Sequence, residues 1–196
     1  MNIEMHLPLV CYITSDLNHR KELHMAILFE TNLAKVNERK IIKLPLAQSR
    51  QLPSRGMVMA KVIINKIDFL VPLEPDGKGS HWFELKDDLC NELKLVIGQT
   101  LTIQLESIDE WPEPEIPDDI MDTIKSAGLL SQWNNVTTKA KWDWLRWIRS
   151  TNNLSTRNKR IQVACSKLEK GDKRPCCFDR SRCTIMDVSK TGVLIE

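Results

Sequence analysis

The sequence predicts an α+β protein, with strands in the N-terminal half of the chain and helices in the C-terminal half. Apolar residues alternate with polar residues through Leu101, Ile103 and Leu105, the pattern of a strand with one buried side. In Thr137–Arg160 the apolar residues recur instead with the period of a helix. The stretch between these regions, 106–116, is acidic and proline-containing and has no apolar period. Strands followed by helices are typical of the α+β class.

Composition places the chain among ordinary globular proteins. It has 196 residues, of which 42% are hydrophobic and 28% charged. There is no run of 18 apolar residues, and the N-terminus lacks the basic and apolar regions of a secretory signal. We therefore expect a cytoplasmic protein without membrane insertion, whose six cysteines are reduced thiols rather than a disulfide framework.

A hairpin is the clearest feature of the N-terminal half. The apolar runs Met57–Ile64 and Ile67–Leu73 are separated by Asn65-Lys66, which predicts a two-residue turn between paired strands. The pattern also predicts strands at Met25–Leu33, Ile41–Leu44, His81–Leu85 and 101–105, a helical turn at Leu46–Leu52 and a helix at Lys86–Val96 that ends before Gly98.

Glu74–Ser80 is rich in turn-forming residues and is expected to be a loop. Its Gly77-Lys78-Gly79 piece resembles a phosphate-binding loop. Such loops lead into a helix N-terminus, whereas this one leads into the apolar pair Trp82-Phe83. We therefore expect no nucleotide site there.

The C-terminal half predicts a helical hairpin. A first helix starts at Pro117-Asp118-Asp119, and a short helical turn follows at Leu129–Trp133. Asn152 and Asn153 break the hairpin, and Ser155 is expected to cap its second helix, which stops at Gly171. The core-facing residues are predicted to be Ala140, Trp144, Leu145, Trp147 and Ile148 in the first arm and Ile161, Ala164, Cys165 and Leu168 in the second.

Trp142 falls outside the apolar stripe of the first arm. On a helical wheel it lies between Arg146 and Arg149, so we expect an exposed indole beside two guanidiniums. Large aromatic side chains next to arginine are common at binding hot spots. This pattern predicts a contact surface; the alternative is that the ring packs under the strand-rich N-terminal half or the C-terminal tail.

The net charge of +2 conceals a strong asymmetry. Residues 139–182 carry a net charge of +9, and the other residues carry −7. Eight acids and no Lys or Arg lie in Glu106–Asp122, directly before the basic region. Either these neighbours neutralise each other within the molecule, or the basic surface remains exposed for an acidic partner.

These observations divide the chain into five parts. They are an N-terminal arm at 1–24, a strand-rich domain at 25–105, an acidic proline-rich linker at 106–116, a helical domain at 117–172 and a basic, cysteine-containing tail at 173–196.

The chain resembles a known bacterial family over about residues 25–183. The resemblance rests on Leu44-Pro45, the hairpin 57–73, the glycine loop before His81, Gly98–Leu101, Pro117–Asp119, Arg146–Ile148, Thr156–Ile161 and Arg174–Phe178. These segments resemble the YdeI/OmpD-associated family, also called bacteriocin-protection proteins. The resemblance implies a small double-split β-barrel followed by a helical module, and no enzymatic activity is established for the family.

No catalytic constellation is evident. A cysteine nucleophile needs a base within hydrogen-bond reach, and His81 lies in the barrel whereas Cys176, Cys177 and Cys183 lie in the tail. No Cys-x2-Cys pair occurs, so we expect neither a metal site nor a cofactor. The three tail cysteines are candidate reactive thiols, and Cys90 and Cys165 are expected to be buried.

The expected function is that of a non-catalytic binding or stress-protection module whose basic helical surface contacts an acidic protein. The alternative is a nucleic-acid-binding protein that uses the same surface, with cations on phosphates and Trp142 on an unpaired base. A thiol-dependent enzyme ranks third. The candidate binding residues are Trp142, Arg146, Arg149, Arg157, Lys159, Arg160 and Arg174.

Overall fold

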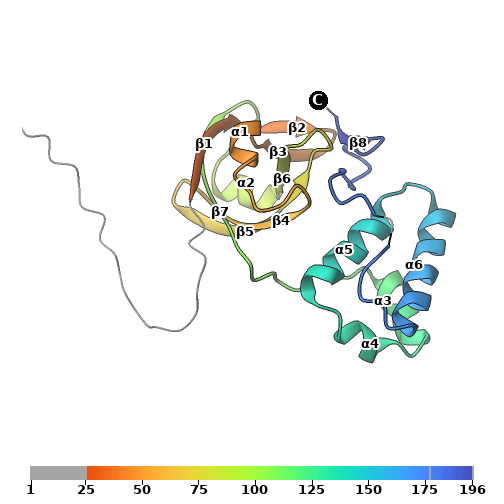
Figure 1. Ribbon diagram of the computed structural model, residues 1–196. Coiled ribbons are helices and arrows are strands. Elements are labelled where there is room, and N and C mark those ends of the chain that lie inside the picture. The colour runs from red at the N-terminus through yellow and green to blue at the C-terminus, as the bar shows by residue number, and fades with distance from the viewer. Residues whose placement is uncertain (1–25, 177, 196) are drawn as a thin grey trace, which may run out of the picture.

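A computed structural model describes residues 26–176 and 178–195 and shows a curled antiparallel sheet followed by a group of helices (Figure 1). This arrangement confirms the predicted α+β class and the barrel-like N-terminal half. The predicted arm at 1–24 lies outside the described residues.

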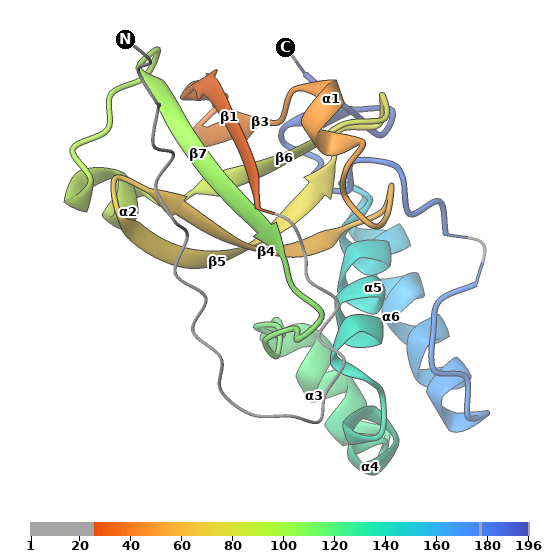
Figure 2. The same cartoon turned by 60° about the vertical axis from the view of Figure 1, so that its left-hand side comes forward.

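Seven strands form one sheet in the order β1-β7-β4-β5-β6-β3-β2, and every neighbouring pair is antiparallel. The sheet curls into a half-barrel (Figure 2), so that Thr31 Oγ1 on β1 donates a hydrogen bond to Lys43 O on β3 over 3.1 Å. The strands are β1 Ile27–Asn32, β2 Ala34–Val36, β3 Arg39–Lys43, β4 Val58–Ile64, β5 Ile67–Pro75, β6 His81–Leu85 and β7 Thr100–Ser107.

Alternation along the strands fills the interior of the half-barrel. Phe29 on β1 pairs with Ile103 on β7, and both side chains are buried while their sequence neighbours Leu28 and Glu30 are exposed. Burying one face of each strand supplies the hydrophobic free energy that holds the sheet together. The predicted strand faces at Met25–Leu33 and 101–105 are therefore confirmed.

The predicted hairpin is also confirmed, but its second strand is longer than expected. Asn65 and Lys66 have φ values of 49° and 69°, the left-handed conformation that a tight two-residue turn requires. The strand β5 continues to Pro75, where Glu74 pairs with Trp82 on β6. Glu74 is thus a buried strand residue and not part of a loop, because arginines from the helical half neutralise its carboxylate.

Two short helices, α1 Leu46–Ser49 and α2 Asp87–Glu92, connect the strands. The prediction that α2 reaches Val96 is wrong, since the chain turns at Lys94 with a φ of 52° and Val96 is 66% exposed. Cys90 is buried in the barrel core as predicted.

Four helices follow, and their apolar faces form a second core. Trp144 is fully buried there, together with Ala140, Leu145 and Ile148. The second arm of the hairpin is capped by Asn153, whose side chain accepts from Thr156 N over 2.9 Å, and not by Ser155 as predicted. The helices are α3 Asp118–Ser126, α4 Leu130–Asn134, α5 Thr138–Arg149 and α6 Leu154–Glu169.

The linker between the two halves contains neither helix nor strand from 108 to 117, yet it packs along α5. Trp142 Nε1 donates to Pro112 O over 2.9 Å, and the Trp142 and Trp111 rings form a T-shaped pair with 6.3 Å between centroids. Lys141 Nζ lies 3.0 Å from a carboxylate oxygen of Glu113. The extended acidic segment is thereby tied to the helical half.

The chain after α6 returns to the barrel (Figure 1). It ends in a small hairpin of β8 Ser189–Lys190 and β9 Val193–Leu194, in which Leu194 N donates to Asp76 O over 2.8 Å. A third apolar cluster joins Trp82 of the barrel to Cys183 and Val188. The described residues of this C-terminal segment, 173–176 and 178–195, are therefore part of the packed structure.

The glycine loop has its role here. Gly77 has a φ of 79°, and a Cβ atom at this position would lie 2.1 Å from Gly192 O. Only glycine combines the left-handed backbone with so close an approach. The loop that resembles a phosphate-binding loop in the sequence therefore packs against the C-terminal segment.

A buried ionic cluster holds the barrel, α5 and the C-terminal segment together. The Glu74 carboxylate accepts from Arg146 Nε over 3.1 Å and from Arg149 Nη2. Arg146 is fully buried, and its Nη2 donates to the carbonyl oxygens of Arg180 and Arg182 over 3.3 and 3.2 Å. One guanidinium thus contacts all three parts of the chain.

We expect Glu74→Gln to lower the free energy of unfolding at pH 7 by about 3–5 kcal/mol, because it leaves Arg146 buried without a counter-charge. Burial by itself raises the pKa of Glu74, but the guanidiniums of Arg149 and Arg146 bring it below its ordinary value of 4.5. Ionised Glu74 therefore stabilises the fold above pH 4.5, and this contribution is lost as the pH falls below that value.

Urea denaturation of wild type and Glu74→Gln at pH 7 and at a series of lower pH values measures both effects. The difference between the two proteins should shrink as the pH falls through the acidic range. Glu38→Gln, which removes one partner of an exposed pair with Lys35, is the control and should leave stability unchanged. A Glu74→Gln variant as stable as wild type at pH 7 would contradict the structural role of the cluster.

Trp142 and Trp144 should differ sharply when replaced by alanine. Trp144→Ala empties a fully buried site and is expected to cost about 3–5 kcal/mol of unfolding free energy. Trp142→Ala removes the contacts with Trp111 and Pro112 and is expected to cost about 1–2 kcal/mol.

Thermal denaturation combined with limited proteolysis distinguishes these effects. Trp142→Ala should remain folded and be cut faster within 108–116, because the ring that anchors the linker is gone. Equal destabilisation by the two substitutions would mean that Trp142 belongs to the helical core.

Candidate functional site

The expected surface of Trp142 flanked by two arginines does not form. Arg146 is 0% exposed, so the prediction that it lies on an open polar face is wrong. The wheel correctly places it away from the apolar stripe, but the barrel and the C-terminal segment cover that side of α5. Trp142 is half-buried against the linker, and Arg149 shares Glu74 and donates from Nε to Thr184 Oγ1 over 3.1 Å.

The acidic run neutralises part of the basic region. Glu113 pairs with Lys141, and Asp119 on α3 pairs with Arg157 on α6. The candidate binding residue Arg157 is therefore half-buried in an ion pair within the molecule. Internal neutralisation, one of the two alternatives from the sequence, accounts for these cations.

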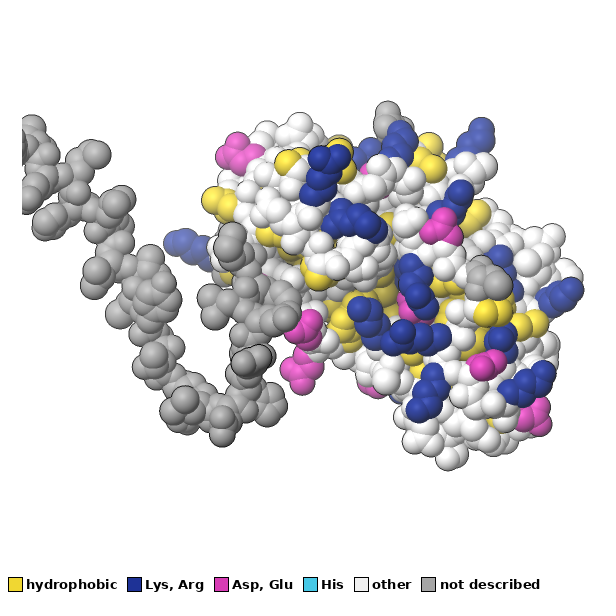
Figure 3. Space-filling model, in the orientation of Figure 1, with side chains coloured by type: hydrophobic (Ala, Val, Ile, Leu, Met, Phe, Trp, Pro, Cys, Tyr) yellow, Lys and Arg dark blue, Asp and Glu magenta, His cyan; other side chains and the backbone are white. Residues whose placement is uncertain are grey.

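Other cations remain uncompensated. Among residues 26–176 and 178–195, four exposed cations on α6 and directly after it form no ion pair: Lys159, Lys170, Lys173 and Arg174. Figure 3 shows Lys and Arg side chains gathered over the helical half and along its junction with the barrel. We call these four residues the basic face.

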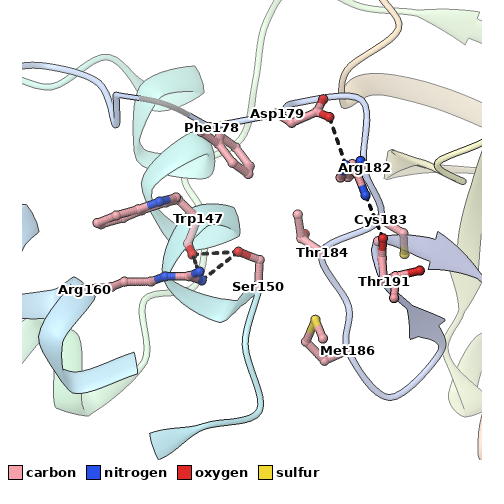
Figure 4. Close-up of a pocket in the computed structure, with 11 residues that line it drawn as sticks. Trp147, Ser150, Arg160, Phe178, Asp179, Arg182, Cys183, Thr184, Met186 and Thr191 are labelled. Carbon is pink, nitrogen blue, oxygen red and sulfur yellow. Dashed lines mark hydrogen bonds and ion pairs between the residues drawn. The ribbon is translucent and has the colours of Figure 1, made fainter. Parts of the chain in front are cut away.

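Arg160, the remaining candidate cation, lines a pocket of about 320 Å³ between the helices and the C-terminal segment. Figure 4 shows two walls, one from α5 and α6 and one from the segment after Phe178. The lining residues are Trp147, Ser150, Arg160, Phe178, Asp179, Arg182, Cys183, Thr184, Met186, Thr191 and Gly192.

The helical wall fixes Arg160 firmly. Its Nη1 donates to Trp147 O over 2.7 Å and to Ser150 Oγ over 2.8 Å, and its guanidinium carbon lies 5.5 Å from the centre of the Trp147 ring. Burial lowers the pKa of Arg160 below its ordinary value, although the group stays charged at neutral pH. No carboxylate of the described residues pairs with it, so the pocket contains an uncompensated cation.

The opposite wall is electrically balanced. Arg182 Nε lies 3.0 Å from Asp179 Oδ2, and its Nη1 donates to Thr191 O over 2.8 Å. Phe178 closes the top of the pocket in Figure 4, with the guanidinium carbon of Arg146 5.4 Å from the ring centre. The pocket thus combines aromatic surface, hydroxyl groups and one free positive charge.

The thiols divide by exposure. Cys176 is exposed, whereas Cys183 is 2% exposed and burial raises the pKa of its thiol. The expectation that Cys183 is accessible is therefore wrong, because the C-terminal segment packs against Trp82. Cys177 lies outside the described residues, and reactivity at Cys176 stays a prediction. Cys90 and Cys165 are buried as predicted.

His81 is engaged within the barrel. Its Nδ1 lies 2.8 Å from Ser49 Oγ and its Nε2 lies 2.8 Å from Gly56 O, and burial lowers its pKa. In the part of the chain that the structure describes, no group of three or more His, Cys, Asp or Glu side chains is placed to hold a metal ion. Across the same residues, no helix combines the length and apolar character that a bilayer span requires.

Sequence reasoning found Arg160 but missed most of the pocket. Phe178 belongs to the Arg174–Phe178 motif, which offered a signal, but Arg182, Thr184 and Met186 carry none. These three residues line the pocket only because the C-terminal segment packs opposite α5 and α6, a long-range contact that local sequence patterns do not report.

Two family models match the chain. A domain of unknown function, DUF1905, matches residues 29–105, which contain most of the half-barrel. The family described as bacteriocin-protection, YdeI or OmpD-associated matches residues 113–171, which contain the four helices. No curated protein matches the chain. The helical domain therefore matches the YdeI/OmpD-associated family, and a DUF1905 domain precedes it in the chain.

Proposed function

We propose that this protein is a non-catalytic binding protein whose basic face contacts an acidic protein partner. The observation that carries the proposal is the contrast between paired and unpaired cations. Arg146, Arg149 and Arg157 are neutralised within the molecule, whereas the basic face is exposed and forms no ion pair among the described residues. Exposed charge of one sign accelerates association with a complementary surface and selects against basic partners.

An acidic protein is favoured over nucleic acid by the state of Trp142. Stacking on an unpaired base requires a free indole face. The Trp142 ring is instead half-buried against the linker, where it contacts Trp111 and donates to Pro112 O. The family's description also names association and protection, and neither word denotes a chemical reaction.

A non-catalytic role agrees with the state of the candidate catalytic groups. Both ring nitrogens of His81 are within hydrogen-bond distance of barrel groups, so neither is free to activate a thiol in the tail. The thiol of Cys183 has a raised pKa, which disfavours the nucleophilic thiolate.

The proposal predicts that poly-L-glutamate, an acidic polypeptide probe, binds the protein through the basic face. The test variant carries Lys159→Gln, Lys170→Gln, Lys173→Gln and Arg174→Gln. It should bind at least about tenfold more weakly, and raising the salt concentration should weaken binding to wild type, because the contact is between exposed charges. Fluorescence anisotropy of labelled probe at two salt concentrations measures both effects.

A matched control removes four cations from the barrel instead: Lys35→Gln, Lys43→Gln, Lys61→Gln and Lys66→Gln. It changes the net charge equally and should retain binding. If both variants lost the same affinity for poly-L-glutamate, the binding would depend on net charge alone and not on the basic face. Tighter binding of a labelled DNA oligonucleotide than of poly-L-glutamate would overturn the proposal in favour of nucleic acid.

A further inference from the structure

The pocket between the helical hairpin and the C-terminal segment has the size and composition of a small-molecule site. Its volume of about 320 Å³ lies at the lower end of the range for ligand pockets. Pockets of this kind combine apolar walls with a few placed polar groups that orient the ligand. The walls here supply both (Figure 4).

Arg160 is the orienting group. The two hydrogen bonds that fix its guanidinium both leave from Nη1, to Trp147 O and Ser150 Oγ. They hold the plane of the group in place and use one of its three nitrogens. An arginine held in this way presents its remaining N–H groups in the fork geometry that matches a carboxylate.

The charge of the pocket defines the charge of its ligand. Arg182 is paired with Asp179, so its charge is already balanced. Arg160 has no such partner among the described residues. One uncompensated positive charge calls for one negative charge, which a carboxylate provides and a phosphate dianion exceeds.

The rest of the lining defines the body of the ligand. Trp147, Phe178 and Met186 contribute aromatic and thioether surface, which suits a flat apolar group. Ser150 and Thr191 add hydroxyl groups at the edges. The small volume limits the body to about one ring.

We propose that this pocket binds a small organic monocarboxylate with a flat apolar body, and that Arg160 receives the carboxylate. The site is separate from the basic face, so either proposal can fail without the other. Binding there requires the C-terminal segment to lie against α5 and α6, since Phe178 and Met186 belong to that segment.

Benzoate is the probe, and isothermal titration calorimetry with ligand-detected NMR measures its binding. Benzyl alcohol has the same ring without the charge, and inorganic phosphate has charge without the ring. Benzoate should bind saturably, and each of the other two should bind at least about tenfold more weakly, because each lacks one of the two features. Comparable binding of benzoate and benzyl alcohol would overturn the role of the charge, and no binding of benzoate would overturn the site.

Arg160→Gln should reduce the affinity for benzoate at least about tenfold. Lys125→Gln on α3 is the matched control, since Lys125 is exposed, lies outside the basic face and does not line the pocket, and this variant should bind benzoate as wild type does. If Arg160→Gln binds benzoate normally, the proposal fails.

A measurement on the wild-type protein protects the test against misfolding of the variant. With ¹³C-methyl methionine, the resonance of Met186, assigned from Met186→Leu, should shift on addition of benzoate. Met57 and Met59, which are buried in the barrel half, should not shift. Shifts at Met57 and Met59 without one at Met186 would place benzoate elsewhere and sink the proposal.

Discussion

The buried carboxylate of Glu74 is the constraint on which the rest of the structure depends. A carboxylate removed from water is stable only when paired. Here two guanidiniums from α5 pair with it at the contact between the barrel and the helices, which we call the joint. Arg146 in turn donates to two carbonyl oxygens of the C-terminal segment. Its Nη1 is buried without a hydrogen-bond partner among the described residues, a cost in free energy that the ion pair with Glu74 offsets. Each part of the chain neutralises or satisfies groups of the other two.

This joint explains how a pocket arises where the two halves and the C-terminal segment meet. Trp147 and Arg160 come from the helical hairpin, and the facing wall comes from residues 178–192. The match to the YdeI/OmpD-associated family ends at residue 171, so most of the residues that line the pocket lie beyond the matched domain. Two contacts place the second wall of the pocket. The backbone of Gly192 packs closely against Gly77, and Arg146 Nη2 donates hydrogen bonds to the carbonyl oxygens of Arg180 and Arg182.

The same arrangement of the barrel, the linker and the helices determines which cations have a carboxylate partner. Some of the cations that face the barrel or the linker have carboxylate partners, as Lys141 has Glu113 and Arg149 has Glu74. The four cations of the basic face have none among the described residues. The acidic linker packs along α5 and therefore neutralises only the cations within its reach. The basic face remains because α6 lies on the far side of the hairpin from the linker (Figure 1).

Local periodicity in the sequence determined the strands β1, β4 and β7, the turn at Asn65-Lys66 and the apolar faces of α5 and α6, because a residue's spacing reports which side of an element is buried. Only the tertiary structure decided that Glu74 and Arg146 are buried as an ion pair, because the two residues lie 72 positions apart in the chain. It likewise decided the position of the C-terminal segment, and with it the wall of the pocket opposite Arg160. A charged side chain looks the same in a sequence whether it will face water or a counter-charge, and only the fold brings the counter-charge to it.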